Sequence, residues 1–464
     1  MADTYDIAFL GAGPAGYQGA IRAAQLGARV AVVEERLLGG VCLNWGCIPT
    51  KTVRASAEVG RAMRRAGEFG FGTVSVVPDM KAIIARKNRV VSGLRGSIGR
   101  LFQAHGIAVV DGRGRLLSPG RIEVEKDGTR RLVEATKIVI STGSRPAGLE
   151  IFPKHRRVVL ADDLLEIDCL PSQLLVVGGG SVGVEMAAIF RELGSQVTIV
   201  EAMDRLLPNE DGEMAEYLQS VLRRRKVKII CSGQVRMVSE KANGFSVALA
   251  DGTELNPDLI LLAVGRRFNT DGIGLAESGV ASESGRLIVD RHMLTNVPGI
   301  YGAGDVVGGW LLAHVAFAEG ICAAEHAMGM DSAMDYKTVP RCVFTIPEYG
   351  AVGVSEEEAR AGRDIKVARF PFKSLGMGQA MGELEGLVKI ITDAATDRIL
   401  GAHIIGPHAA DLVAEIALAM RADLPSRTIM ETIHSHPTLS EAVLEVAQAL
   451  HGQAIHQPPQ EAKQ

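Results

Sequence analysis

TYDIAFLGAGPAGYQGAIRAAQLGARVAVVEE, residues 4–35, contains an apolar run, a glycine-rich turn, a small-residue helix pattern and a second apolar run that ends in acids. Gly11 permits a tight turn, Gly13 lets a pyrophosphate approach the backbone, and Gly16 lets the helix pack closely on the strand. The helix N-terminus faces the phosphates, and Glu34 can accept ribose hydroxyls. The segment therefore predicts a dinucleotide site in a Rossmann-like α/β domain.

A second segment, residues 173–208, repeats this pattern. Glu34 lies 18 residues after Gly16, and Glu201 lies 18 residues after Gly183. Two dinucleotides are implied, although a duplication with one inactive site would give the same pattern. The Glu201 carboxylate accepts the 2′-hydroxyl of NAD and repels a 2′-phosphate, which favours NAD over NADP.

Two cysteines lie close together in GGVCLNWGCIPTK, residues 39–51. Cys42 and Cys47 could not form a disulfide on a straight helix, so the backbone must bend between them. Lys51 and the N-terminus of the helix that begins near Cys47 favour a thiolate over a thiol at Cys47. The alternatives are two reduced cysteines that only pack or a metal site, which is disfavoured because the usual CxxC spacing is missing.

The composition excludes several classes of protein. The 464 residues suggest about three domains, and the net charge of −4 is spread without long blocks of one sign. We therefore expect neither a nucleic-acid partner nor an anionic membrane partner. Scattered cysteines, no signal-peptide pattern and no run of about 18 apolar residues predict a cytoplasmic protein.

ETIHSHPTLSEAVLEVAQAL, residues 431–450, carries two histidines before a helix pattern. Thr438 and Glu441 fit a capping box, with Thr438 at the N-cap and Glu441 at the third helical position. His434 and His436 could form a metal pair or lie on the surface. These local interpretations explain the segment without any catalytic role.

Taken together and in this order, the motifs resemble those of the pyridine-nucleotide disulfide oxidoreductases, a family of flavoproteins, from residue 5 to about 450. The resemblance implies an α/β fold with two Rossmann-like dinucleotide-binding domains, for FAD and NAD, and an α+β C-terminal interface domain for dimerisation. The implied parts are an FAD-binding domain with the redox disulfide at 1–150, an NAD-binding domain at 151–270, a central domain that completes the FAD site at 271–343, an interface domain at 344–452 and a flexible tail at 453–464.

Catalytic roles are also implied by the resemblance. Cys42 and Cys47 would form the redox disulfide, with Cys47 next to the flavin, and Glu441 would orient the base His436. A lysine and a glutamate would pair beside the flavin. The full catalytic set is Cys42, Cys47, Lys51, Glu185, His436 and Glu441.

The resemblance implies cofactor contacts at further positions, with no metal. Tightly but non-covalently bound FAD would contact Gly11, Gly13, Ala15, Gly16, Glu34, Gly40, Val41, Cys42, Lys51, Gly112, Thr142, Gly143, Ser144, Asp305, Leu311, Leu312, Ala313 and His314. NAD would contact Gly178, Gly180, Ser181, Val182, Gly183, Glu201, Val235 and Gly265.

The dihydrolipoamide dehydrogenase branch of the family fits best. Mercuric reductases would carry a cysteine pair near the C-terminus, and glutathione reductases would favour basic residues where Glu201 stands. The implied enzyme is a homodimer whose interface domain completes the partner's active site and whose substrates are lipoyl domains of a 2-oxoacid dehydrogenase or glycine cleavage system. Trp45 and Phe317 could narrow substrate access. The alternatives are an NADH-dependent reductase of another small disulfide and a non-catalytic flavin-binding scaffold.

Overall fold

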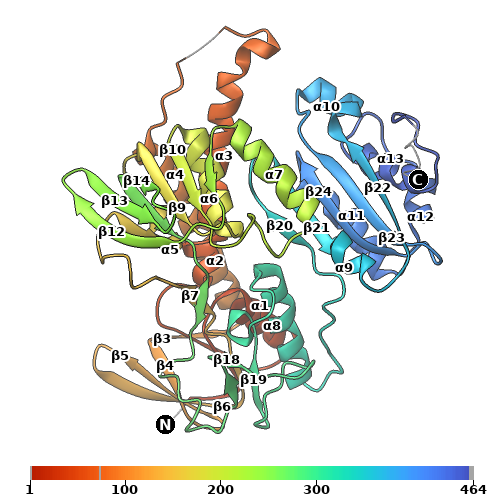
Figure 1. The fold of residues 1–464 in the computed structure, drawn as a ribbon. Helices are drawn as coiled ribbons and strands as arrows, with labels where there is room; N and C mark the ends of the chain where they lie inside the picture. The colour runs from red at the N-terminus through yellow and green to blue at the C-terminus, as the bar shows by residue number, and fades with distance from the viewer. Residues whose placement is uncertain (1–2, 73–74, 459–464) are drawn as a thin grey trace. The chain divides into compact units, whose positions relative to one another are not determined.

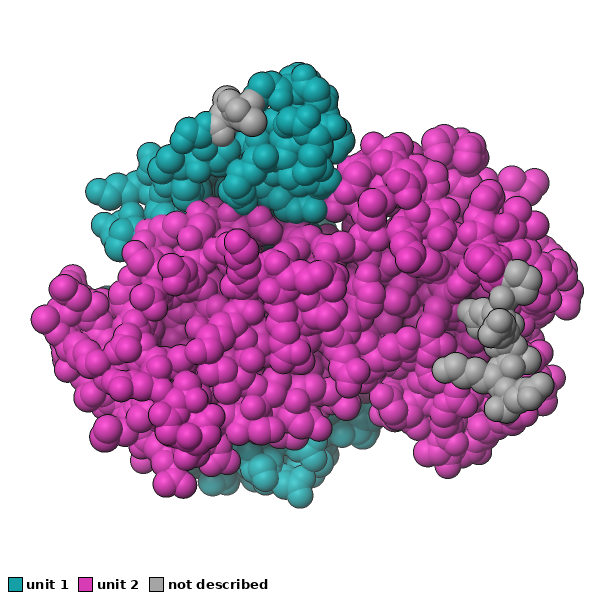
Figure 2. Space-filling model, turned by 45° about the horizontal axis from the view of Figure 1, so that its top comes forward, with its two compact units in different colours: residues 1–148, 160–169, 265–335 teal, residues 149–159, 170–264, 336–464 magenta. Residues whose placement is uncertain are grey.

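The computed structural model describes residues 3–72 and 75–458, which divide into two compact units (Figure 2). Unit 1 consists of three segments, within 1–148, 160–169 and 265–335. Unit 2 consists of the segments within 149–159, 170–264 and 336–464. Each unit contains one of the two predicted glycine loops.

A mainly parallel sheet forms the centre of unit 1 (Figure 1). Its strands are β1 (Asp3–Leu10), β2 (Val30–Glu34), β3 (Ala108–Asp111), β4 (Arg113–Ser118), β5 (Arg121–Lys126), β6 (Thr129–Ile140) and β19 (Ile300–Gly302). Their order is β3-β2-β1-β6-β5-β4, and β19 pairs with β6. Ile7 and Phe9 of β1 belong to one apolar cluster, while Ala8 and Leu10 belong to another. Alternation along the strand therefore builds a core on both faces of the sheet.

Helices and short ribbons complete unit 1. Its helices are α1 (Pro14–Gln25), α2 (Gly40–Asn44), α3 (Cys47–Arg64), α4 (Met80–Ala104), α5 (Ala161–Leu164) and α8 (Ala313–Ala327). Its ribbons pair β7 (Ser144–Pro146) with β16 (Arg266–Phe268), and β17 (Ser282–Glu283) with β18 (Arg286–Leu287). Short 3-10 helices lie at Ala66–Phe69 and Asp305–Val307.

Unit 2 begins with a second parallel sheet. Its strands are β8 (Val158–Leu160), β9 (Gln173–Val177), β10 (Gln196–Val200), β11 (Lys228–Ile230) and β15 (Leu259–Leu262), in the order β11-β10-β9-β15-β8. Helices α6 (Ser181–Leu193) and α7 (Gly212–Arg224) accompany it, together with an antiparallel ribbon of β12 (Val235–Lys241), β13 (Gly244–Leu249) and β14 (Glu254–Leu255).

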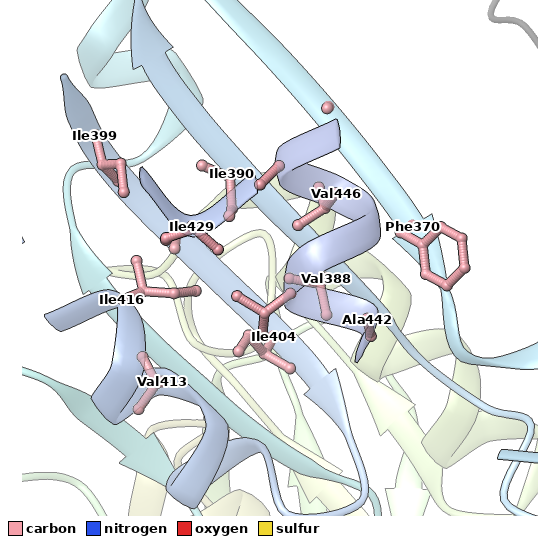
Figure 3. Packing of buried hydrophobic residues seen from close by; sticks show 14 of the residues in the cluster. Phe370, Val388, Ile390, Ile399, Ile404, Val413, Ile416, Ile429, Ala442 and Val446 are labelled. Carbon is pink, nitrogen blue, oxygen red and sulfur yellow. The ribbon is translucent and has the colours of Figure 1, made fainter. Parts of the chain in front are cut away.

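An antiparallel sheet forms the C-terminal part of unit 2. Its strands are β20 (Arg341–Val343), β21 (Glu348–Gly353), β22 (Ile365–Pro371), β23 (Leu387–Asp393) and β24 (Ile399–Gly406), in the order β20-β21-β24-β23-β22. Its helices are α9 (Glu356–Arg360), α10 (Gly376–Met381), α11 (Ala409–Arg421), α12 (Ser426–Glu431) and α13 (Glu441–Leu450), with a 3-10 helix at Phe372–Ser374. Val413 of α11 and Val446 of α13 pack with Ile390 and Ile404 of the sheet in one buried cluster (Figure 3).

A buried ion cluster joins the start of α7 to the antiparallel sheet. The Lys389 side chain is 1 % exposed, and its Nζ lies 2.9 Å from Asp211 Oδ2, 2.8 Å from Glu213 Oε2 and 2.7 Å from Glu356 Oε2. Burial acts to raise the pKa of each carboxyl group, but bonds to this ammonium and to neighbouring donors leave each pKa below its ordinary value. The three carboxylates and the lysine therefore depend on one another.

The architecture confirms the predicted fold class: two Rossmann-like α/β domains and an α+β domain. Helix α11 begins at Ala409, and its residues Val413 and Ile416 belong to the buried cluster of the C-terminal antiparallel sheet. Of the predicted tail at 453–464, residues 459–464 lie outside the described residues. None of the helices within 3–72 and 75–458 is both long and apolar enough to cross a membrane.

Candidate active site

The first glycine loop connects β1 to α1. Gly11 has φ +106°, and a Cβ atom at Gly16 would lie 1.9 Å from the Gly11 carbonyl oxygen, so only glycine lets the helix start this close to the strand. The Glu34 carboxylate accepts the N–H of Ala12 at 2.8 Å and the N–H of Arg36 at 2.8 Å. Burial raises the pKa of Glu34, and these two N–H groups oppose the rise. The acid is therefore fixed against the loop.

The second glycine loop, between β9 and α6, repeats these contacts. Gly178 has φ +108°, and a Cβ atom at Gly183 would lie 2.0 Å from the Gly178 carbonyl oxygen. The Glu201 carboxylate accepts the N–H of Gly179 at 2.5 Å and the N–H of Met203 at 2.7 Å. The duplication seen in the sequence is thus a duplication of backbone geometry and of acid placement.

The two cysteines meet where α2 ends and α3 begins. Cys42 lies in α2, Cys47 is the first residue of α3, and both are reduced thiols. The Gly46 N–H donates to the Val41 carbonyl at 2.7 Å, which reverses the chain between them. The Cys42 thiol donates to the Cys47 sulfur, and this bond, followed by burial, raises the pKa of Cys42 well above its ordinary value, while the charge of Lys51 opposes the rise. The arrangement suits a thiol at Cys42 and a thiolate at Cys47, where the helix dipole favours negative charge.

Asn44 holds the loop before the cysteines. Its buried amide nitrogen donates to the carbonyl oxygens of Leu38 at 3.0 Å and Gly40 at 2.9 Å, and its oxygen accepts Arg95 Nη1 at 3.3 Å. Neither Asn44 nor Arg95 was predicted from the sequence. An asparagine near glycines commonly indicates a turn, but it does not indicate a partner such as Arg95, which lies 51 residues away on α4.

Trp45 lies between the two cysteines and stacks on Arg36. The guanidinium carbon lies 3.7 Å from the ring centroid, a cation–π contact. The sequence predicts that Trp45 narrows substrate access. The Arg36 guanidinium covers one face of the indole. The expected effect of Trp45 on substrate access stays a prediction.

Two predicted flavin contacts, Ser144 and Asp305, lie together. The Ser144 hydroxyl donates to Asp305 Oδ2 at 2.5 Å and accepts Arg266 Nε at 2.6 Å. Arg266 was not predicted, since its position in VGRRF gave no signal beyond a strand end. The Thr142 hydroxyl donates to the Asn269 carbonyl oxygen at 2.8 Å. This bond joins the segment before β7 to the segment after β16.

The remaining predicted flavin residues also belong to unit 1. The Gly112 N–H donates to the Glu34 carbonyl oxygen at 2.9 Å, at the ends of the parallel strands. Ala15 lies in α1, and Gly40 and Val41 lie in α2. Near the start of α8 are Leu311 with φ +51°, the N-cap residue Leu312, and the first helical residues Ala313 and His314.

The predicted NAD residues lie in unit 2, with one exception. Gly180 is the N-cap of α6, followed by Ser181 and Val182. A Cβ atom at Gly180 would meet nothing within 4 Å, which leaves space for a phosphate in front of the helix. Val235 begins β12, while Gly265 belongs to unit 1.

Glu185 is a buried acid in α6. It is 7 % exposed, and its Oε1 accepts the Phe344 N–H at 2.8 Å. This bond fixes one oxygen of the carboxylate on the helix. The predicted pairing of Glu185 with Lys51 stays a prediction.

His436 and Glu441 form a hydrogen-bonded pair. His436 Nδ1 lies 2.8 Å from Glu441 Oε1, and Glu441 Oε2 accepts the Thr438 N–H at 2.8 Å. Burial acts to raise the pKa of Glu441, but the Thr438 N–H and then His436 leave it below its ordinary value. Because Nδ1 donates to a carboxylate, Nε2 is the basic nitrogen of the neutral ring. The His436 side chain is 77 % exposed, so this nitrogen can meet a substrate.

The predicted capping box is wrong in its hydroxyl half. Helix α13 begins at Glu441, with Ser440 as N-cap, so Glu441 is its first residue rather than its third. The Thr438 hydroxyl donates to the Ser435 carbonyl oxygen at 2.8 Å instead of capping the helix. His434 is hydrogen-bonded through Nε2 to Glu415 at 2.9 Å. Within the part of the chain that the structure describes, no three His, Cys, Asp or Glu side chains are placed to hold a metal ion.

Two family models match the chain. The one described as pyridine nucleotide-disulphide oxidoreductase matches residues 5–320, and the dimerisation domain of the same family matches residues 339–447. Together they include both glycine loops, the cysteine pair and the pair of His436 with Glu441.

Relatives and solved structures match over nearly the full chain. The dihydrolipoyl dehydrogenase of Bacillus subtilis is 40 % identical, over 98 % of this chain and 100 % of the relative. The structure of LpdA from Mycobacterium tuberculosis has a TM-score of 0.90 at 32 % identity, over 96 % of this chain and 99 % of that one. The HOCl-induced flavoprotein disulfide reductase RclA from Escherichia coli has a TM-score of 0.87 at 31 % identity, with coverage of 96 % and 99 %.

Proposed function

The chain belongs to the pyridine nucleotide-disulphide oxidoreductase family, and from this premise we propose that it oxidises dihydrolipoyl groups and reduces NAD. The observation that carries the substrate is the full-length likeness to dihydrolipoyl dehydrogenases, which the Bacillus subtilis enzyme illustrates at 40 % identity. The pair of Cys42 and Cys47 and the pair of His436 and Glu441 supply the chemical groups that this reaction needs.

FAD and NAD are the cofactors, and both glycine loops fit a dinucleotide. We assign FAD to the loop of unit 1, where Ser144 and Asp305 offer polar groups in the same unit as the cysteine-bearing helices. We assign NAD to the loop of unit 2, where Gly180 faces open space and Glu201 can accept ribose hydroxyls. When bound, FAD supplies the two-electron relay between the thiol pair and NAD.

The thiol chemistry begins with a proton transfer. His436 Nε2 takes the proton of one substrate thiol, and Glu441 stabilises the resulting imidazolium. The substrate thiolate attacks Cys42 in the Cys42–Cys47 disulfide, which forms a mixed disulfide and releases Cys47 as a thiolate. The second substrate thiol then displaces Cys42, so that the lipoyl disulfide closes and Cys42 takes up a proton.

Further roles rest on the resemblance to the family. Lys51 would stabilise negative charge on the flavin, and Glu185 would hold Lys51. The chain carries the family's dimerisation domain, and we propose a homodimer in which His436 of one subunit serves the cysteine pair of the other. The partners would be lipoyl domains of a 2-oxoacid dehydrogenase or glycine cleavage system, in the cytoplasm. The domain boundaries expected from the sequence remain part of this proposal.

A second candidate is the reduction of another small disulfide with NADH. The likeness to RclA, a flavoprotein disulfide reductase, favours this alternative at 31 % identity. The two functions share the cysteine pair and both cofactors but differ in the substrate.

The test is NAD reduction by dihydrolipoamide, with NADPH and glutathione disulfide as the contrast. We expect turnover with dihydrolipoamide and NAD, no turnover after Cys47→Ser, and a loss of about 10²–10⁴-fold after His436→Ala. Bound flavin without turnover of dihydrolipoamide in the unmodified enzyme would contradict the proposal and favour the second candidate.

A further inference from the structure

Helix α13 carries two acids one turn apart, and each holds a histidine. Glu441 and Glu445 lie on the same side of the helix, since residues four apart are neighbours. His436 Nδ1 lies 2.8 Å from Glu441 Oε1, and His456 Nδ1 lies 2.6 Å from Glu445 Oε1. The first histidine precedes the helix and the second comes after it. A second histidine–carboxylate pair therefore lies beside the pair that serves as the base.

Glu445 anchors the chain that returns after α13. It is 5 % exposed. Its Oε2 accepts the N–H of Ile455 at 3.2 Å and the N–H of His456 at 3.3 Å, while Oε1 accepts the His456 ring. These three donors all come from two residues of the C-terminal segment. A buried carboxylate deprived of such donors is strongly unfavourable, so Glu445 and residues 455–456 hold each other in place.

The chain that returns after α13 also affects the pKa of Glu441, the carboxyl group paired with the base His436. The His456 charge is one of the causes that lower the pKa of Glu441, after the Thr438 N–H and His436. The His456 ring is hydrogen-bonded to Glu445 on α13, and its charge acts on Glu441 one turn earlier on the same helix. The His456 side chain is 69 % exposed, whereas that of Glu445 is 7 % exposed.

Building on the proposed function, we propose that Glu445 and His456 are positioning residues for the base His436. Glu445 fixes the segment at 455–456, and that segment holds an imidazole beside Glu441. The Glu441 carboxylate is thereby kept in place and oriented toward His436 Nδ1. Neither residue touches the substrate, and both act through Glu441.

The test compares His456→Ala, His456→Asn and Glu445→Gln. Asparagine can donate from a position like that of Nδ1 but carries no charge. His408→Asn is the matched control, because His408 forms an exposed pair with Asp411 at 3.3 Å and asparagine tolerates its φ of +55°. For each variant, kcat and KM for dihydrolipoamide are measured across pH, together with NADH oxidation by ferricyanide, which needs both cofactors but not the base.

We expect His456→Ala and Glu445→Gln to lower kcat for dihydrolipoamide by roughly tenfold, as modest misplacement of a catalytic group does. Ferricyanide reduction should stay unchanged. Because loss of a nearby positive charge raises the pKa of a carboxyl group, the acid limb of the kcat profile should move to higher pH. His456→Asn should restore most of kcat while the acid limb stays shifted.

Two results would overturn the inference. One is that His456→Ala matches His408→Asn in kcat and in pH profile, and the other is that ferricyanide reduction falls in parallel, which would indicate a purely structural role. Absence of dihydrolipoamide turnover in the unmodified enzyme would refute the proposed function instead. The anchoring is read separately by hydrogen exchange, where Glu445→Gln should speed exchange at residues 453–458 and unchanged exchange would refute it.

Discussion

The two glycine loops share one design but differ in the chain that crosses them. Gly11 and Gly178 have φ of +106° and +108°, and Glu34 and Glu201 each accept two backbone N–H groups at corresponding positions. Beyond its acid, the chain returns across each loop. The Gly39 N–H donates to the carbonyl oxygen of residue 12 at 2.8 Å, and the Leu207 N–H donates to that of residue 179 at 2.9 Å.

The crossing chain gives each site its own character. In unit 1 it brings Gly40 so close that a Cβ atom there would lie 2.5 Å from the Gly13 Cα, and it continues directly into the cysteine pair. In unit 2 it carries Leu207 and Pro208, while Gly180 keeps open space in front of it. The same glycine loop can therefore form a closed site, which suits a tightly bound cofactor, or an open site, which suits a nucleotide that exchanges.

The largest effect is expected from Gly40→Ala. Gly40 has φ +60°, and the new Cβ would overlap the Gly13 backbone, so strain of about 1–3 kcal/mol adds to the overlap. The purified variant should contain little flavin, as measured by its absorbance per chain. Gly180→Ala, a change at the N-cap of α6 in the open site, should keep its flavin and raise KM for NAD. Equal flavin content in the two variants would show that the sites do not differ in this way.

Lys389→Met should destabilise unit 2 by about 3–5 kcal/mol, because it leaves buried carboxylates without their cation. Both tryptophans, Trp45 and Trp310, belong to unit 1. Tryptophan fluorescence therefore reports on unit 1, and circular dichroism reports on the whole chain. We expect the variant to show an early denaturant transition in circular dichroism that fluorescence does not follow. Arg369→Met, which removes the more exposed cation of the same cluster, should have a smaller effect.

Acid should weaken unit 2 through His403. Burial lowers the pKa of this histidine to about 4, although the Asp211 charge opposes the shift. Below about pH 6.5 the unfolded chain binds a proton that the folded chain does not, so stability is lost as pH falls from 6.5 toward 4. The loss reaches about 3 kcal/mol. Denaturant midpoints measured from pH 7.5 to 4.5 should show this slope, and His403→Gln, which cannot titrate, should flatten it.

The smallest effect is expected from Glu201→Ala. It removes a charged acceptor of ribose hydroxyls, worth about 1.5–3 kcal/mol, so kcat/KM for NAD should fall roughly 10–100-fold. Flavin content should not change. Glu34→Ala is the mirror change and should loosen flavin without changing KM for NAD. Loss of flavin from the Glu201 variant would mean that the two sites are assigned to the wrong cofactors.

The sequence allowed prediction of whatever is local or repeated. The two glycine loops and their acids follow from short spacings, and the pairing of His436 with Glu441 was implied by the resemblance to the family. The bonds of Asn44 to Arg95, of Ser144 to Arg266 and of Lys389 to Asp211 join residues 51, 122 and 178 positions apart, and no periodic pattern signals such pairs. Thr438 was misjudged because a closer acceptor, the Ser435 carbonyl, competes for its hydroxyl.

The most direct test is a single turnover in the absence of oxygen. Oxidised enzyme is mixed with one equivalent of dihydrolipoamide, a sample is alkylated for peptide mass spectrometry, and the remainder receives NAD and is filtered. We predict that Cys42 and Cys47 change from a disulfide to two alkylated thiols, that NADH appears in the filtrate, and that flavin stays with the protein. Reduction of any other cysteine, or NADH formation without a change in this pair, would contradict the account.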